Sequence, residues 1–136
     1  MLLGFAGWTL LILLVGVGAR RVLLIFQGKA ALTSFPGDMA HGSAAYRRAV
    51  RAHANCVENL PVFGAIILTA AAAGLSTPSI DRLATISLTA RVLQTLIHLC
   101  LPETNATIAA RFAFFLPQIL AMIAMGIQIG LNLTVR

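Results

Sequence analysis

An uncharged apolar stretch opens the chain, and it limits the fold more than any other feature. No charged side chain occurs between Met1 and Arg20. About 20 apolar residues in helical form are enough to cross the hydrocarbon layer of a bilayer. The stretch lacks the basic start and the small-residue cleavage site of a secretory signal peptide. The sequence therefore predicts a first membrane helix over residues 1–26.

The composition of the whole chain is also that of a membrane protein. Of the 136 residues, 59% are hydrophobic and only 10% are charged, whereas soluble domains carry about a quarter charged residues. Further apolar spans are predicted over residues 44–73, 83–101 and 111–133. We therefore expect an all-α membrane protein, with a single integral membrane domain over residues 1–136 that forms a four-transmembrane-helix bundle.

The basic residues are distributed unevenly between the two sides of the predicted bundle. The net charge is +6, but these residues border apolar spans, so the pattern indicates membrane orientation and not nucleic-acid binding. One side holds Arg20, Arg21, Lys29, Arg47, Arg48, Arg51 and Arg111, and the other holds Arg82 and Arg136. By the positive-inside rule, both termini should lie outside and the loop over residues 28–43 in the cytoplasm.

The two cysteines, Cys56 and Cys100, lie in or beside apolar spans near the basic side. We expect reduced thiols there and no structural disulfide. Neither cysteine belongs to a metal-ligand pattern such as C-x-x-C, so no metal site is predicted.

Residues 47–61 carry charge into the second predicted span. Because residues three and four apart are neighbours on a helix, the polar side chains share one face: Arg48, Arg51, Asn55, Glu58 and Asn59. Charge inside a membrane helix is costly, which favours a functional site. Arginine forks suit carboxylates and Glu58 suits an ammonium, so a zwitterionic ligand would match this face. The alternative is that these charges form buried pairs that hold helices together.

The third predicted span carries Arg91, Gln94 and His98 on one face. At a rise of about 1.5 Å per residue, Arg91 lies about 12 Å from the outer end, near the middle of the bilayer. An unpaired arginine at this depth is very costly. Glu58 is the one carboxylate inside a predicted span, so a structural ion pair between Glu58 and Arg91 is expected. For His98, a structural hydrogen bond and a ligand contact both stay open.

The second predicted span also carries a recognisable motif, R-x-x-R-A-x-x-N-x-x-E-x-x-P-x-F, from Arg48 to Phe63. This motif resembles the second-helix signature of the MAPEG family, the membrane-associated proteins of eicosanoid and glutathione metabolism. The form R-A-H-A-N-x-x-E-N-L-P-V-F is similar to the bacterial branch. The resemblance implies a homotrimer that binds glutathione at subunit interfaces near the cytoplasmic face. It also implies membrane-embedded glutathione transferase or peroxidase activity, of the microsomal glutathione S-transferase type, on lipophilic electrophiles.

The resemblance further implies roles for individual residues. Arg51, Asn55 and Glu58 match family positions that hold glutathione, and His53 falls where relatives place a polar ligand contact. Gln94 and His98 fall where several family enzymes have tyrosines or a histidine. Arg111 is the best counterpart of the arginine that holds the thiolate, provided that the loop before it carries extra residues. The expected glutathione-binding set is Arg48, Arg51, His53, Asn55, Glu58, Gln94 and His98, with Arg111 as the catalytic residue.

Two other functions stay open at this stage. The third and fourth predicted spans contain no tyrosine, and the family includes non-catalytic members, so a lipid- or ligand-binding membrane protein of the same fold is one alternative. The other is a small four-helix proton-coupled exporter that uses Glu58, although the neighbouring arginines would repel a cation. The bacterial character of the motif predicts an inner-membrane protein with periplasmic termini, in contact with lipids and a lipophilic substrate.

Overall fold

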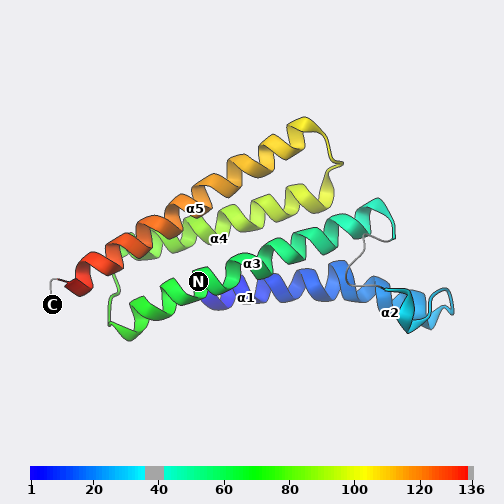
Figure 1. Cartoon of the computed structure of the whole chain (residues 1–136), viewed down its shortest axis with the longest axis horizontal. Coiled ribbons are helices and arrows are strands. Elements are labelled where there is room, and N and C mark those ends of the chain that lie inside the picture. Colours follow the sequence, from blue (N-terminus) through cyan, green and yellow to red (C-terminus); the bar gives the residue numbers. More distant parts are fainter. Residues whose placement is uncertain (36–41, 135–136) are drawn as a thin grey trace.

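The structure is a computed structural model that describes residues 1–35 and 42–134. All regular secondary structure within these residues is helical (Figure 1). The first span is continuous and has three parts: α1 (Leu2–Leu11), the π-helical η1 (Ile12–Gly18) and α2 (Ala19–Phe26). It is followed by the short 3₁₀ helix η2 (Leu32–Ser34), and then by α3 (Ala44–Ala72), α4 (Pro78–Cys100) and α5 (Asn105–Thr134). Residues 36–41 of the predicted cytoplasmic loop, and Arg136, lie outside the described residues.

By length and composition, four helices in the described residues can cross a membrane, which confirms the predicted fold class: Leu2–Phe26, Ala44–Ala72, Pro78–Cys100 and Asn105–Thr134. Two of them begin earlier than the apolar pattern indicated, at Pro78 instead of 83 and at Asn105 instead of 111. The reason is capping. Thr77 accepts a hydrogen bond from the backbone of Ile80 at 3.2 Å, which starts α4 in a polar segment that hydropathy alone does not assign to a span.

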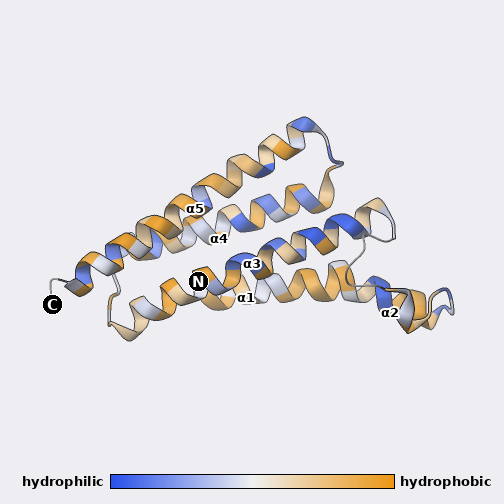
Figure 2. Ribbon diagram, viewed as in Figure 1, coloured by the Kyte–Doolittle hydropathy of each residue, from blue (hydrophilic) through white to orange (hydrophobic). Residues whose placement is uncertain are grey.

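The helices form two antiparallel pairs that lie beside each other (Figure 1). One pair is the first span with α3, and the other is α4 with α5. The start of α3, the end of α4 and the start of α5 lie at the same end of the molecule, which we call the basic end. Figure 2 shows hydrophilic residues gathered toward this end of α3, α4 and α5, with apolar residues over most of the remaining surface. The opposite end is called the apolar end.

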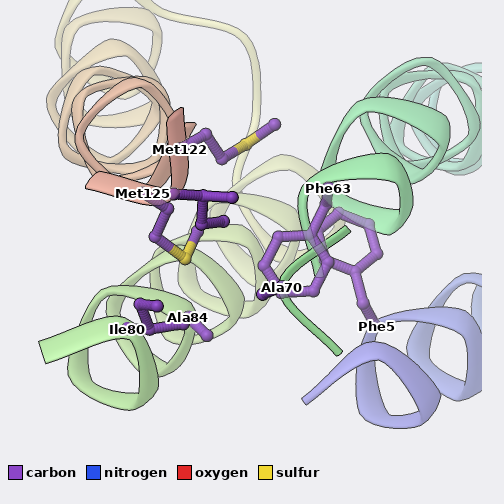
Figure 3. Packing of buried hydrophobic residues seen from close by; sticks show 8 residues of the cluster. Phe5, Phe63, Ala70, Ile80, Ala84, Met122 and Met125 are labelled. Carbon is purple, nitrogen blue, oxygen red and sulfur yellow. The ribbon is translucent and has the colours of Figure 1, made fainter. Parts of the chain in front are cut away.

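The main hydrophobic core lies toward the apolar end and joins all four spans. Figure 3 shows its packing. The buried residues of this core are Phe5, Phe63, Ala70, Ile80, Ala84, Met122, Met125 and Ile129. The rings of Phe5 and Phe63 stack with centroids 5.1 Å apart, an arrangement that adds to the stabilisation from burial alone.

The small face of α3 packs against the first span. Ala49, Ala52 and Cys56 are buried there, next to Ile12 and Val17 of η1. The same face also meets α4, because Leu99 packs on both of these clusters. The packing of small residues thus sets the direction of the polar face described next.

Candidate functional site

The basic end of α3 is fixed by contacts with the end of the first span. Ser43 caps α3, accepting hydrogen bonds from the backbone of Tyr46 at 3.3 Å and from Arg20 Nη1 at 2.7 Å. The guanidinium of Arg20 lies 5.5 Å from the centre of the Tyr46 ring, and Arg21 donates from Nε to the Tyr46 hydroxyl. These cation–π and hydrogen-bond contacts hold the two helices in register.

A cavity of about 320 Å³ lies between α3, α4 and α5, and we call it the interhelix cavity. Its lining residues are Asn55, Glu58, Asn59, Arg91, Gln94, Ile108, Arg111, Phe112 and Phe115. It therefore brings together five residues from the sequence prediction, on three helices: Asn55, Glu58, Arg91, Gln94 and Arg111. The polar face of α3 thus meets polar residues of α4 and α5 in the structure.

The α5 side of the interhelix cavity combines a guanidinium with apolar side chains. Ile108 and Phe115 are three and four residues from Arg111 and share its helix face, and Phe112 is adjacent. The rings of Phe112 and Phe115 lie 6.4 Å apart, and Phe112 is largely exposed. An apolar ligand part could therefore reach Arg111 from the membrane side. These apolar residues are not among the site residues predicted from the sequence, although their spacing from Arg111 can be read there.

Several buried polar atoms near this cavity have no hydrogen-bond partner among the described residues. Arg91 is 1% exposed, and its Nε and Nη2 are unpartnered, as is Oε1 of Gln94. Buried polar groups are nearly always satisfied in native proteins, so water, Glu58 or a polar ligand in the cavity would each meet a need of these atoms. Gln118 donates to Oδ1 of Asn59 at 3.3 Å and links α5 to α3 at this level.

The predicted ion pair between Glu58 and Arg91 is not formed within the described part of the chain, although both residues line the interhelix cavity. Glu58 is exposed in the single chain and Arg91 is buried. Their pairing stays a prediction. Four predicted ligand residues do not line this cavity: Arg48, Arg51, His53 and His98. His53 is half-buried, and His98 is buried with no hydrogen-bond partner for Nε2 among the described residues.

A second cavity, of about 200 Å³, lies at the basic end and is called the arginine cavity. Its lining residues are Ala44, Arg47, Arg48, Arg51, Pro102 and Glu103. It contains two of the predicted ligand residues, Arg48 and Arg51. The two cavities are lined by successive turns of α3, with Arg51 on one and Asn55 on the other.

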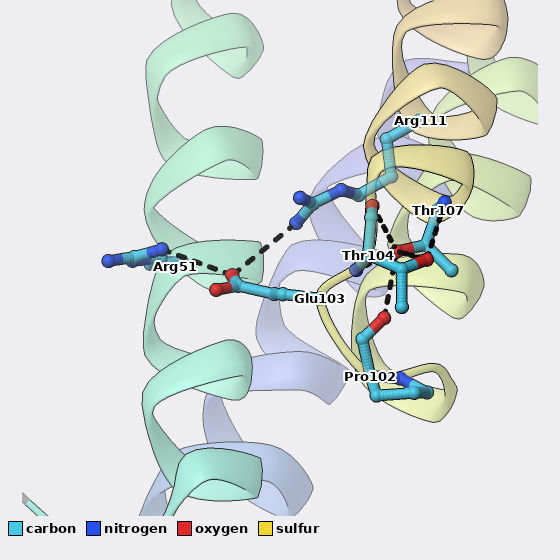
Figure 4. Close-up of polar contacts among 6 residues, drawn as sticks. All are labelled: Arg51, Pro102, Glu103, Thr104, Thr107 and Arg111. Carbon is cyan, nitrogen blue, oxygen red and sulfur yellow. Dashed lines mark hydrogen bonds and ion pairs between the residues drawn. The ribbon is translucent and has the colours of Figure 1, made fainter.

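Glu103 is the functional candidate that sequence reasoning missed. Figure 4 shows its carboxylate between two arginines, with Oε1 at 3.1 Å from Arg51 Nη1 and 3.8 Å from Arg111 Nη1. Arg51 and Glu103 are 52 positions apart in the sequence. Glu103 lies between the third and fourth predicted spans, and nothing in the sequence pairs it with either arginine.

Both cysteines are free thiols. Cys56 is buried with its sulfur 3.7 Å from Oγ1 of Thr95, whereas Cys100 is exposed. Within the described residues, no group of three or more metal-ligating side chains comes together.

Comparison with known proteins gives one match. The profile of the MAPEG family matches residues 1–131, nearly the whole chain. No curated protein and no solved structure matches the chain.

Proposed function

Because this chain belongs to the MAPEG family, we propose that it is a glutathione transferase or peroxidase of the membrane that acts on lipophilic electrophiles. The family is one of four-helix membrane proteins and is generally associated with glutathione. An integral membrane protein with a function related to glutathione follows from that membership. The specific activity, the glutathione site and the roles below are our proposal.

The proposal rests mainly on one observation: the interhelix cavity is lined both by charged or polar residues and by apolar residues. Asn55, Glu58 and Arg91 offer charge and hydrogen bonds for a polar, zwitterionic tripeptide. Phe112 and Phe115 offer an apolar surface for a membrane-soluble partner. Ligand sites typically combine apolar walls with a few placed polar groups, and this cavity also has unmet donors on Arg91 that a ligand would satisfy.

In this proposal Arg48 and Arg51 bind the carboxylates of glutathione, because a guanidinium fork matches a carboxylate. Glu58 binds the ammonium group and Asn55 an amide. Arg111 faces the sulfur and lowers the pKa of the thiol, which increases the thiolate fraction at neutral pH. The thiolate then attacks the electrophilic carbon, the new C–S bond displaces the leaving group with its electron pair, and the thiol proton passes to solvent.

The remaining predicted contacts, Gln94, His53 and His98, are assigned to the same ligand. Only Gln94 lines the interhelix cavity in the single chain, so His53 and His98 require a further surface. Family members generally form trimers. We therefore propose a homotrimer in which glutathione lies between subunits and a neighbouring chain completes the site.

The proposed location is the inner membrane of a bacterium, with both termini in the periplasm and the basic end at the cytoplasmic face. The distribution of arginines between the two ends supports this orientation. An impermeant thiol reagent applied to intact cells should leave a single cysteine introduced at Gly28 unmodified and should label one introduced at Ser76. The opposite labelling pattern would reverse the orientation.

The proposal is tested with purified protein in nanodiscs. Calorimetry should detect glutathione binding, conjugation of a model aryl halide should follow, and the thiolate absorbance of bound glutathione should appear at lower pH than for free glutathione. Binding without conjugation and without a thiolate shift would support the second candidate, a non-catalytic ligand-binding protein of this fold. Absence of binding at millimolar glutathione would remove both glutathione functions.

A further inference from the structure

Glu103 lies where two parts of the proposed ligand site meet. Its carboxylate contacts Arg51, which lines the arginine cavity, and Arg111, which lines the interhelix cavity. Figure 4 shows it reaching from the α4–α5 turn across to α3. In the structure without ligand, one carboxylate of the chain thus faces two of the three arginines that we assign to the anionic groups of glutathione.

The turn that carries Glu103 is held by its own hydrogen bonds. The backbone N–H of Thr104 donates to Thr107 Oγ1 at 2.8 Å, and the backbone N–H of Thr107 donates to Thr104 Oγ1 at 3.2 Å. The Thr107 hydroxyl also donates to the carbonyl of Pro102 at 2.7 Å. This reciprocal arrangement resembles a capping box at the start of α5, so the backbone position of Glu103 is defined independently of the arginines.

The contact itself is accessible and therefore exchangeable. The side chains of Arg51 and Glu103 are 63% and 44% exposed, and exposed ion pairs are weak because water screens them and side-chain freedom is lost. A ligand carboxylate could replace Glu103 at little cost. Two negative groups cannot share the same guanidinium without repulsion, so the ligand and Glu103 compete for Arg51.

We propose that Glu103 is an internal counter-ion that occupies Arg51 and Arg111 when no ligand is bound and is displaced by the carboxylate and thiolate of the incoming ligand. Glu103 thereby lowers the affinity of the site for anions and keeps the two arginines oriented before binding. Weak organic anions are excluded more strongly than a ligand that engages both arginines. This inference rests on the proposed glutathione site and adds a residue that controls its affinity.

The test is calorimetric binding of glutathione to Glu103→Gln in nanodiscs at low salt. Removing the competing charge should tighten binding about two- to fivefold, the change expected for loss of one exposed ion pair. Glu103→Asp, which retains the charge, should bind close to the original affinity. Asp81→Asn removes a carboxylate from the first turn of α4, at the apolar end, and should leave binding unchanged.

The outcomes separate the inference from the proposed function. If the original protein binds glutathione and Glu103→Gln binds it equally or more weakly, Glu103 is not a competitor and the inference is wrong. If neither the original protein nor Glu103→Gln binds glutathione, the proposed function fails. The counter-ion role is then tested with succinate, a dicarboxylate without a thiol. If succinate raises the melting temperature of Glu103→Gln more than that of the original protein, the counter-ion role is supported. If it raises both equally, the counter-ion role is rejected.

Discussion

The apolar end and the basic end of the bundle are built from the same helices but pack in different ways. At the apolar end, aromatic, aliphatic and methionine side chains from all four spans form one buried core (Figure 3). At the basic end, α3, α4 and α5 enclose two cavities lined by arginines, carboxylates and amides. Among the described residues, buried polar atoms without a hydrogen-bond partner include Nε of Arg48 and Nε2 of His98 in the helix halves that lead to this end, and Nε1 of Trp8 and Oγ of Ser87 in the opposite halves.

This difference separates the part that holds the fold together from the part that can bind. Close packing makes each buried methylene group count, and the groove that α3 and α5 leave at the apolar end offers mostly apolar side chains and no charged ones. Open, polar packing contributes less to stability and leaves donors and acceptors available. The four predictions below test this division, from the largest expected effect to the smallest.

We expect the core at the apolar end to contribute most to the free energy of unfolding. Phe63 is fully buried against Phe5, so Phe63→Ala should lower the free energy of unfolding by about 3–5 kcal/mol. Its neighbour Val62 is 53% exposed, and Val62→Ala is the matched control with a small effect. Thermal unfolding in detergent measures both. Equal losses for the two variants would show that this core does not hold the bundle together.

We expect residues at the basic end to determine turnover. Arg111→Ala should lower turnover about 10²–10³-fold, the usual loss when one stabilising donor is removed from a reacting anion, and it should raise the pKa of the bound thiol. Thermal stability should change little. Arg82→Ala removes an exposed arginine from the first turns of α4 at the other end and should leave turnover intact. If Arg111→Ala and Arg82→Ala lose activity to the same extent, the loss results from the lower net positive charge and not from removal of a site residue.

Glu58 and Arg91 should be coupled in the assembled protein. Both line the interhelix cavity, and an unpaired Arg91 inside the membrane would be very costly. Glu58→Gln and Arg91→Leu should each destabilise the protein, and the double variant should recover part of the loss, with a coupling energy of about 1–3 kcal/mol. The measurement is a double-mutant cycle of thermal unfolding. Additive losses would mean that Glu58 serves the ligand alone.

Arg51 should affect binding more than catalysis. Arg51→Ala should weaken glutathione binding about tenfold, since a hydrogen bond to a charged group is lost, while turnover at saturation should stay nearly constant because a carboxylate clamp acts in ground and transition states alike. Steady-state kinetics with varied glutathione separates KM from kcat. A fall in kcat with KM unchanged would place Arg51 at the reacting sulfur instead.

The sequence analysis was most successful where one helix contained the whole signal. The polar face of α3 follows from spacing alone, and the structure buries small residues on the opposite face at Ala49, Ala52 and Cys56. The four spans follow from hydropathy because the bilayer requires long apolar helices. The starts of α4 and α5 were wrong by several residues because their first turns are polar and are defined by threonine caps.

Contacts between distant segments could not be predicted in this way. Glu103 is a turn residue in the sequence, and only folding brings it to Arg51 and Arg111. The buried state of His98 and the separation of Glu58 from Arg91 within one chain likewise depend on how the two helix pairs meet. A periodic pattern gives the face of a helix, but not the residue that a neighbouring helix places against it.

The central claim is that glutathione binds at the basic end, across the interhelix cavity and the arginine cavity. Amide hydrogen exchange of the nanodisc-embedded protein, with and without saturating glutathione, tests this claim most directly. The account predicts slower exchange in the first turns of α3, in the α4–α5 turn around Glu103 and in the first turns of α5, with no change in the α3–α4 turn over residues 73–77. Protection in that turn, or unchanged exchange at the basic end with glutathione bound, would contradict it.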